Sequence, residues 1–438
     1  MTASISNGVN IIKKDLPKSI MEITVTVAGD EMNGYFEQAA ANLSQNIKIS
    51  GFRSGKAPVD TVEKKVGSQE LFNEAANIAV RRTLPKVLEE NKIDSLGVPD
   101  IKILKIAKGN DFEYKAEIAV LPKVLLPDYK KIASGVKKQK VEVGDKEISD
   151  ALMLLRKSRA SFIQVDRGAA KGDRVNIDFS AVDEKGVKIK NGEQKNQPLI
   201  IGDNLFVGEF EDNLMGLKLG DCKEFQVKFP DNYYDKEISG KIINFKVKVN
   251  SVEEIILPEE KDDFAKSLGE FDGLELLKKS IREGLISEKE LREQERWAKE
   301  VLWRIAEKSE MDVPEVLINS ELERIIGNLR ANVTQTGLRF DDYLEHIKKT
   351  VDDLKKDNRK EAENSVKVNL VLKNIGDKEK VEVSEKETEE RLNKELLRHY
   401  KSIDEASKKI DLPRLKDYYY GIIRNEKIIN LLNKFLAD

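Results

Sequence analysis

The sequence predicts a multi-domain α+β protein: a small α+β domain, an antiparallel β domain and an all-helical region, in that order. Strand-like alternation and helical spacing are mixed in the first quarter of the chain, glycine turns separate short strands in the middle, and helical spacing fills the rest. A length of 438 residues allows each part its own core. We therefore divide the chain into an N-terminal domain at residues 1–120, a linker arm at 121–164, a β domain at 165–256 and a helical region at 257–438.

The composition is that of a highly charged chain with few aromatic residues. Charged residues make up 35% and hydrophobic residues 39%, yet the net charge is only −3. A nucleic-acid contact must therefore be local, because the chain has no overall basic field. The single cysteine, Cys222, excludes an intramolecular disulfide and favours a reducing compartment. No secretory signal and no run of 18 apolar residues occurs, so we expect a cytoplasmic protein without a membrane partner.

The N-terminal domain mixes the two periodicities. Alternating apolar and polar residues predict strands over residues 18–27, 98–106 and 111–120. Spacings of three and four predict helices over residues 30–47, 58–66 and 68–91. Asp30 is expected to cap the first helix, and Lys108-Gly109-Asn110-Asp111 suits the turn of a hairpin.

The loop between the first two helices combines glycines, one aromatic ring and cations. No acidic residue occurs between residues 48 and 59, and Lys48 adds a further positive charge. The glycines let the backbone bend tightly, so the ring and the guanidinium are expected to point outward. An apolar ring beside cations suits a polyanionic surface with an apolar notch, although an ordinary solvated loop has the same composition. The candidate binding residues are Gly51, Phe52, Arg53, Gly55 and Lys56.

A phosphate-binding P-loop is excluded for this segment. Only three residues separate Gly51 from the Gly55-Lys56 pair, and Ala57 supplies no hydroxyl for magnesium. The run Gly51-Phe52-Arg53-x-Gly55-Lys56-x-Pro58, between helices near an N-terminus, resembles the ribosome-docking signature of the bacterial trigger factor family. That resemblance implies contact with a large-subunit protein and rRNA beside the exit tunnel of the ribosome.

The linker arm and the β domain follow. Leu121-Pro122 and Leu126-Pro127 discourage regular structure. We expect a strand over residues 136–143 and a helix over residues 145–163. Three alternating runs then predict a compact antiparallel sheet with turns at Asp183-Glu184-Lys185-Gly186 and Leu219-Gly220-Asp221. These runs are residues 173–179, 222–229 and 241–249.

The β domain resembles the FKBP-type prolyl isomerase domain that trigger factors carry. The resemblance rests on the motifs K-G-D-x-V-x-I-D-F, G-x-F-E-x-x-L-x-G-x-K-x-G, F-P-x-x-Y and G-K-x-x-x-F-x-V-x-V. It implies an apolar pocket that binds the twisted X-Pro amide and needs no acid, base or metal. The same aromatic residues could simply be the core of a small sheet. By position in the pattern, the pocket residues are Phe179, Val207, Phe210, Tyr233 and Phe245, with Asp178 near the rim.

Two departures from the FKBP-type pattern bear on activity. Gly208-Glu209 stands where the family usually has Pro-Gly, and Gln197 stands where it usually has an aromatic residue. If that aromatic residue forms one wall, the pocket binds proline less tightly. The alternative reading is therefore a holding chaperone whose isomerase domain is weak or inactive.

The helical region offers apolar stripes without a catalytic constellation. Pro314 is expected near the start of one helix, and Ser384 with Glu387 forms a capping box for another. His346 and His399 lack histidine or cysteine partners at helical spacing, so neither a metal nor a cofactor is predicted. The turn before this region and the segment Asp312-Val313-Pro314-Glu315-x-Leu317-Ile318 also resemble trigger factor.

Taken with the family resemblance, the sequence predicts an ATP-independent, ribosome-associated chaperone with peptidyl-prolyl isomerase activity. Its partners would be the ribosomal large subunit and unfolded nascent polypeptides, which the helices would hold against exposed apolar side chains. An RNA-binding protein is the rival class, but one cluster of about three cations gives little affinity for RNA. The sequence leaves open whether the free protein forms a homodimer and which clients it prefers.

Overall fold

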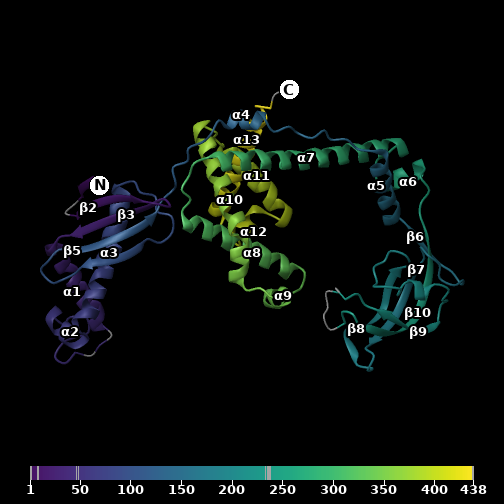
Figure 1. Cartoon of the computed structure of the whole chain (residues 1–438), viewed down its shortest axis with the longest axis horizontal. Helices are drawn as coiled ribbons and strands as arrows, with labels where there is room; N and C mark the ends of the chain where they lie inside the picture. Colours follow the sequence, from purple (N-terminus) through teal and green to yellow (C-terminus); the bar gives the residue numbers. More distant parts are fainter. Residues whose placement is uncertain are drawn as a thin grey trace. The chain divides into compact units, whose positions relative to one another are not determined.

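The computed structural model describes residues 2–6, 9–45, 47, 49–231, 233 and 238–436, so Lys48 lies outside the described residues. The chain forms two compact units, one made of Met1–Lys138 with Gln294–Asp438 and the other of Gln139–Glu293. An α+β N-terminal part, an antiparallel β domain and a helical C-terminal region confirm the predicted fold class (Figure 1). None of the helices in these described ranges is both long and apolar enough to cross a membrane.

The N-terminal part is an antiparallel sheet with helices packed on one face (Figure 1). The strand order is β1-β2-β3-β5-β4, and the three predicted strands correspond to β3, β4 and β5. Strands β1 and β2 were not expected, because the adjacent Ile11 and Ile12 break the alternation. The elements are β1 Thr2–Ser6, β2 Val9–Leu16, β3 Ile20–Val27, α1 Gly29–Gln45, α2 Val59–Val66, α3 Ser68–Glu90, β4 Asp100–Lys105 and β5 Phe112–Ala119.

The predicted cap of α1 is wrong in two respects: the helix begins one residue earlier than expected, and a different aspartate accepts the N–H at its start. The helix begins at Gly29, so Asp30 lies in its first turn. The carboxylate of Asp111 accepts the Gly29 N–H at 2.9 Å, so a residue of the β4–β5 connection satisfies this helix end. A Cβ at position 29 would lie 3.1 Å from the backbone of Asn110, which explains a glycine at this close approach.

The predicted strand at residues 136–143 is wrong. After α4 (Tyr129–Ser134), the chain is extended but pairs with no strand among the described residues. Side chains of α7 (Leu274–Lys308) instead satisfy its backbone. In the first unit, Trp297 donates to the Val136 carbonyl at 2.8 Å. In the second unit, Lys289 donates to the Glu142 carbonyl at 2.8 Å, so alternation here reflects contact with a helix.

The β domain is built from five antiparallel strands around a central β10. The sheet order is β6-β10-β7-β8, and β9 also pairs with β10. The predicted helix ends earlier than expected, at Ser158, because Ser161–Gln164 pairs with β10 as strand β6. Strand β8 was also not expected, since its polar sequence has little alternation. The elements are α5 Asp145–Ser158, β6 Ser161–Gln164, β7 Arg174–Val182, β8 Lys188–Ile200, β9 Cys222–Lys228 and β10 Ile242–Ile256.

The C-terminal region is helical as predicted (Figure 1). Pro314 immediately precedes α8, and the predicted capping box is present, with the Ser384 hydroxyl accepting the Glu387 N–H at 3.3 Å. Buried aliphatic residues of α7, α10 and α13 share one core with Trp297. The remaining helices are α6 Asp262–Leu268, α8 Glu315–Gln335, α9 Phe340–Ile347, α10 Val351–Lys378, α11 Glu385–His399, α12 Ile403–Ser407 and α13 Leu412–Asn433.

Candidate functional site

The inner face of the β-domain sheet carries an apolar pocket of about 480 Å³. The structure brings five of the six residues predicted for this site into its lining, and only Asp178 is missing from it. Apart from the Tyr233 phenol, the lining holds no ionisable side chain, so proton transfer by a carboxylate, imidazole or amine is not built into it. The lining residues are Phe179, Ala181, Ile189, Gly192, Leu205, Phe206, Val207, Phe210, Phe229, Tyr233, Ile238, Ile243 and Phe245.

Aromatic rings form the floor and one wall of the pocket. The Phe210 ring stacks on the Phe206 ring at 4.5 Å and meets the Phe245 ring edge-on at 5.0 Å. Phe210 and Phe245 are buried, so they belong to the domain core as well as to the pocket floor. Phe179 is half-buried and lies 5.9 to 6.1 Å from the centres of three other rings. Pocket and core therefore overlap, as they must in a sheet of this size.

Asp178 does not lie at the rim as predicted. Consecutive residues of a strand point to opposite faces, and its neighbour Phe179 occupies the pocket face. The Asp178 carboxylate accepts the Asn196 N–H at 2.8 Å and the Asn250 amide at 2.6 Å. These bonds, that of Asn196 first, hold the pKa of Asp178 below its ordinary value. Asp178 thus fastens β8 to β7 and β10, and makes no contact with the pocket.

Glu211 is a component of the pocket that the sequence analysis quoted only as part of a motif. It is 5% exposed, and burial by itself would raise its pKa. Four backbone N–H groups outweigh that effect and hold the pKa below its ordinary value. The carboxylate accepts them from Gly202 at 2.8 Å, Asn204 at 3.1 Å, Leu205 at 2.8 Å and Phe206 at 3.2 Å.

The two departures from the family pattern do not remove a wall. Gln197 is paired with Ile177 in the β7–β8 ladder and is not among the lining residues. Gly208 adopts φ +63°, a left-handed conformation that proline cannot reach, and a Cβ there would lie 3.0 Å from Val227. The local turn therefore requires glycine at this position, and the adjacent Val207 still lines the pocket.

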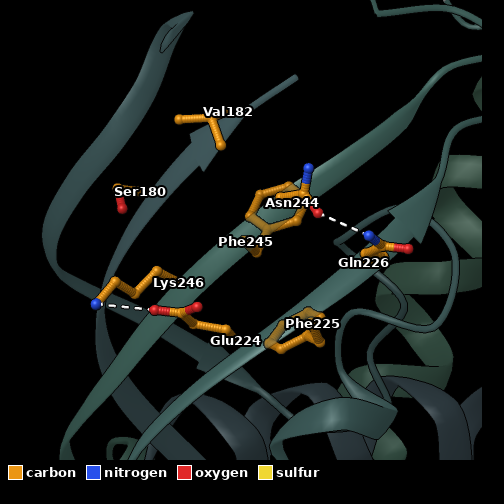
Figure 2. A pocket seen from close by; sticks show the side chains of 8 residues that line it. All are labelled: Ser180, Val182, Glu224, Phe225, Gln226, Asn244, Phe245 and Lys246. Carbon is orange, nitrogen blue, oxygen red and sulfur yellow. Dashed lines mark hydrogen bonds and ion pairs between the residues drawn. The ribbon is translucent and has the colours of Figure 1, made fainter. Parts of the chain in front are cut away.

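A second hollow of about 430 Å³ lies on the outer face of the same sheet (Figure 2). Four of its polar side chains are paired with one another. Lys246 lies 2.9 Å from the Glu224 carboxylate, and the Gln226 amide donates to Asn244 at 2.9 Å, as the dashed lines in Figure 2 show. Because these four groups satisfy each other across β9 and β10, the Ser180 hydroxyl is the polar side-chain group of the described lining that stays without a partner.

The loop between α1 and α2 is anchored at both ends and exposed at its tip. Ile49 and the buried Ala57 pack against the N-terminal core. Between them Phe52 is 45% exposed, and the exposed Arg53 has no ion-pair partner among the residues that the structure describes. Gly51 adopts φ +86°, which the turn before the tip requires.

The rest of this loop and its supports keep the tip in place. Lys56 is exposed, and Gly55 adopts φ +77° with its N–H bonded to the Ser44 carbonyl at 3.4 Å. The Lys108 ammonium binds Asp60 of α2 at 2.8 Å, which ties that helix to the β4–β5 connection. A loop fixed on both sides presents its tip without the entropy cost of ordering a mobile segment.

In the part of the chain that the structure describes, metal-ligating side chains do not gather into a metal-binding site. Across the described ranges, no group of three or more histidine, cysteine or acidic residues is arranged to hold a metal ion. Cys222 is exposed at the start of β9.

The helical region exposes large apolar side chains: Trp303, Leu338, Leu397, Ile403, Tyr418 and Tyr420.

Comparison with known proteins accounts for nearly the whole chain. The family model described as bacterial trigger factor protein matches residues 9–155, and the model of its C-terminus matches residues 273–434. The model of the FKBP-type peptidyl-prolyl cis-trans isomerase matches residues 165–250.

Curated relatives match over nearly their full length. The trigger factor of Caldicellulosiruptor saccharolyticus is 32% identical and is aligned over 95% of this chain and 94% of its own length. That of Clostridium kluyveri is 31% identical over 97% and 98%. A solved trigger factor chaperone, studied for promiscuous substrate recognition in folding and assembly, shares the fold with a TM-score of 0.55 at 20% identity, over 97% of this chain and 99% of that one. The chain belongs to the trigger factor family of chaperones and carries its FKBP-type domain.

Proposed function

We propose that this chaperone accelerates X-Pro isomerisation in the inner pocket of its β domain. The supporting observation is a concave lining rich in phenylalanine rings, with no carboxylate, imidazole or amine among the described lining residues. Rotation about the X-Pro bond has a barrier of roughly 20 kcal/mol, because amide resonance is lost in the twisted state. A twisted amide is less polar at its oxygen and nitrogen than a planar one, so an apolar enclosure favours it over both planar isomers.

Each pocket residue has a role in this proposal. Phe179, Tyr233 and Phe245 surround the proline ring, and Phe210 forms the floor. The Val207 N–H has no hydrogen-bond partner among the residues that the structure describes, and we assign it to a substrate backbone carbonyl outside the twisting amide, where it would orient the chain. Asp178 has no direct role.

The experiment is a proline tetrapeptide assay with the full-length chain. The account predicts a rate of cis-to-trans conversion that rises linearly with protein concentration above the uncatalysed rate. A rate that stays at the uncatalysed value up to micromolar protein would leave a holding chaperone with an inactive isomerase fold, the alternative raised by the sequence.

We further propose that the α1–α2 loop docks the chain on the large ribosomal subunit. Phe52 would enter an apolar notch while Arg53 and Lys56 contact rRNA phosphates, with Gly51 and Gly55 shaping the turns. What supports this is an exposed ring beside a guanidinium that has no ion-pair partner in the described part of the chain, on an anchored loop. Pelleting with purified large subunits tests it. Steep salt-dependent binding to naked RNA would instead support the RNA-binding alternative.

The helical region is proposed to hold unfolded nascent chains. Exposed leucine, tyrosine and tryptophan side chains among many charges give weak, distributed contacts that release quickly. We propose domain boundaries at residues 120, 164 and 256, so that the N-terminal domain, the linker arm, the β domain and the helical region act together on one emerging chain. We propose that this takes place in the cytoplasm. Suppressed aggregation of a denatured client, without nucleotide, is the expected result.

A further inference from the structure

We propose that Glu211 is a positioning residue for isomerisation, which holds the Leu205–Phe206–Val207 wall of the pocket in place. The inference rests on the isomerase activity proposed above. Leu205 and Phe206 both line the pocket, and both donate their backbone N–H to the Glu211 carboxylate. Phe210, directly before Glu211, forms part of the pocket floor. Two consecutive residues therefore act on the pocket, Phe210 as its floor and Glu211 by binding the backbone of its wall.

Apart from the Phe206 ring, which packs on Phe210 and Phe179, the segment of residues 202–206 has few other means of support. It joins the end of β8 to the pocket wall and forms no ladder with a strand. Asn204 adopts φ +54°, a left-handed conformation that costs a non-glycine residue free energy unless other contacts maintain it, and Gly202, at φ +101°, has the conformation that only glycine adopts readily. The Leu205 side chain is 75% exposed, so packing contributes little there.

A carboxylate is the side chain that fits this set of four donors. One oxygen accepts the N–H groups of Gly202 and Asn204, and the other accepts those of Leu205 and Phe206. Each carboxylate oxygen has two lone-pair sites, so all four bonds form at once. Glutamine has nearly the same shape, but its NH₂ group would face two N–H donors and lose two bonds. Charge and geometry can therefore be separated by mutation.

The buried charge also lacks a counter-ion. No lysine or arginine in the described part of the chain forms an ion pair or hydrogen bond with Glu211. Burying an anion without a cation is costly unless several hydrogen bonds stabilise the charged form. The four backbone N–H groups thus form an anion-binding site that the Glu211 carboxylate occupies. We infer that their arrangement depends on this carboxylate.

The test compares three full-length variants: Glu211→Gln, Glu211→Asp and the matched control Glu209→Gln. Glu209 is exposed, lies on the same turn and has no side-chain partner in the described structure. Two quantities are measured for each variant: kcat/KM with a proline tetrapeptide, and hydrogen–deuterium exchange of the peptide covering residues 200–207. Exchange of β7 and β10 reports on the global fold.

We expect Glu211→Gln to lower kcat/KM by about 10- to 100-fold, since displacing a wall by about 1 Å suffices for this. Exchange at residues 200–207 should accelerate about tenfold while β7 and β10 keep their protection. Glu211→Asp keeps the charge and should fall between wild type and Gln, and Glu209→Gln should match wild type. A role in packing alone predicts the opposite order, with Gln close to wild type and Asp the worse variant.

The outcomes separate this inference from the proposed activity. Wild-type protein without catalysis refutes the isomerase function, while the exchange data still test whether Glu211 orders the segment. Active wild type with unchanged kcat/KM and unchanged exchange in Glu211→Gln overturns the inference alone. Should the Gln variant not fold, Glu211→Asp decides: a folded Asp variant with wild-type kcat/KM also overturns it.

Discussion

Replacing Phe179 by leucine is the most informative change in the proposed active site. The substitution removes a ring from the pocket wall but keeps an apolar side chain of similar reach. Phe179 is half-buried, so its ring can contact both the protein core and a bound proline. Its backbone lies in β7, paired on both sides by β8 and β10, which should keep the strand in place.

The expected magnitude follows from the ring contacts. Phe179 meets the rings of Phe206, Phe210 and Phe245 at 5.9, 6.0 and 6.1 Å. Such pairs contribute about 0.5–1.5 kcal/mol each beyond buried area. Loss of the ring removes one contact of this kind with proline and loosens three others, so we take a loss of about 2 kcal/mol from the transition state. At 1.36 kcal/mol per tenfold change, this corresponds to a roughly 30-fold lower kcat/KM.

The assay is tetrapeptide isomerisation by the full-length chain, with Lys246→Gln as the matched control. Lys246 lies on the outer face of the same sheet, in the hollow where it pairs with Glu224 (Figure 2). The account predicts that this control keeps wild-type kcat/KM, because its side chain points away from the inner pocket. If Phe179→Leu retains kcat/KM within a factor of about two, or if Lys246→Gln loses activity, the inner pocket is not the catalytic site.

Three further predictions concern stability. Trp297→Phe removes a buried N–H donor to the linker backbone and should lower the free energy of unfolding in urea by about 2 kcal/mol. The control Trp303→Phe, at a side chain 47% exposed, should change that free energy little. Equal losses for the two variants would refute the role of this hydrogen bond. Gly168→Ala should destabilise by about 1–3 kcal/mol, because its Cβ would lie 2.6 Å from a backbone oxygen; unchanged unfolding would contradict the close approach. The Lys427 ammonium, aided by the helix cap, lowers the pKa of Glu387 to about 2. Since this lies below the unfolded value of 4.5, the stabilisation is present above about pH 4.5 and lost as pH falls toward 2. The protection factors of the α11 amides, which correct for the intrinsic effect of pH on exchange, should fall over that range, and Glu387→Gln should make this fall smaller.

Residues with strong local constraints were predictable from the sequence. Alternation located β3, β5, β7, β9 and the first part of β10, and a capping box located the start of α11. The aromatic residues of the FKBP-type pattern are brought together in one pocket because sheet pairing places Phe179 and Phe245 on the same face. Gly51 and Gly55 mark turns that require positive φ.

Features that depend on distant partners were not predictable. Residues 136–143 alternate like a strand, yet their backbone is satisfied by side chains of α7. Strand β6 is short and pairs only with β10, about ninety residues later in the chain. Asp178 was assigned to the rim by its position in the FKBP-type pattern, whereas the alternation of side chains along the strand directs it to the other face. The role of Glu211 becomes visible only once four amides converge on it.

The proposed position of this chain beside emerging polypeptides depends on docking of the α1–α2 loop to the large ribosomal subunit. Phe52 is 45% exposed, so burying the rest of its ring contributes about 1 kcal/mol. A charge-assisted bond from Arg53 to a phosphate contributes about 2 kcal/mol. The double variant Phe52→Ala with Arg53→Ala should therefore bind about 100-fold more weakly, with a salt slope shallower by about one.

Co-sedimentation of the full-length chain with large ribosomal subunits measures the contribution of Phe52 and Arg53 to binding most directly. The account predicts that wild type and the exposed-lysine control Lys102→Ala pellet together with the subunits, whereas the double variant stays in the supernatant at the same concentration and salt. Equal pelleting of wild type and a correctly folded double variant would contradict it.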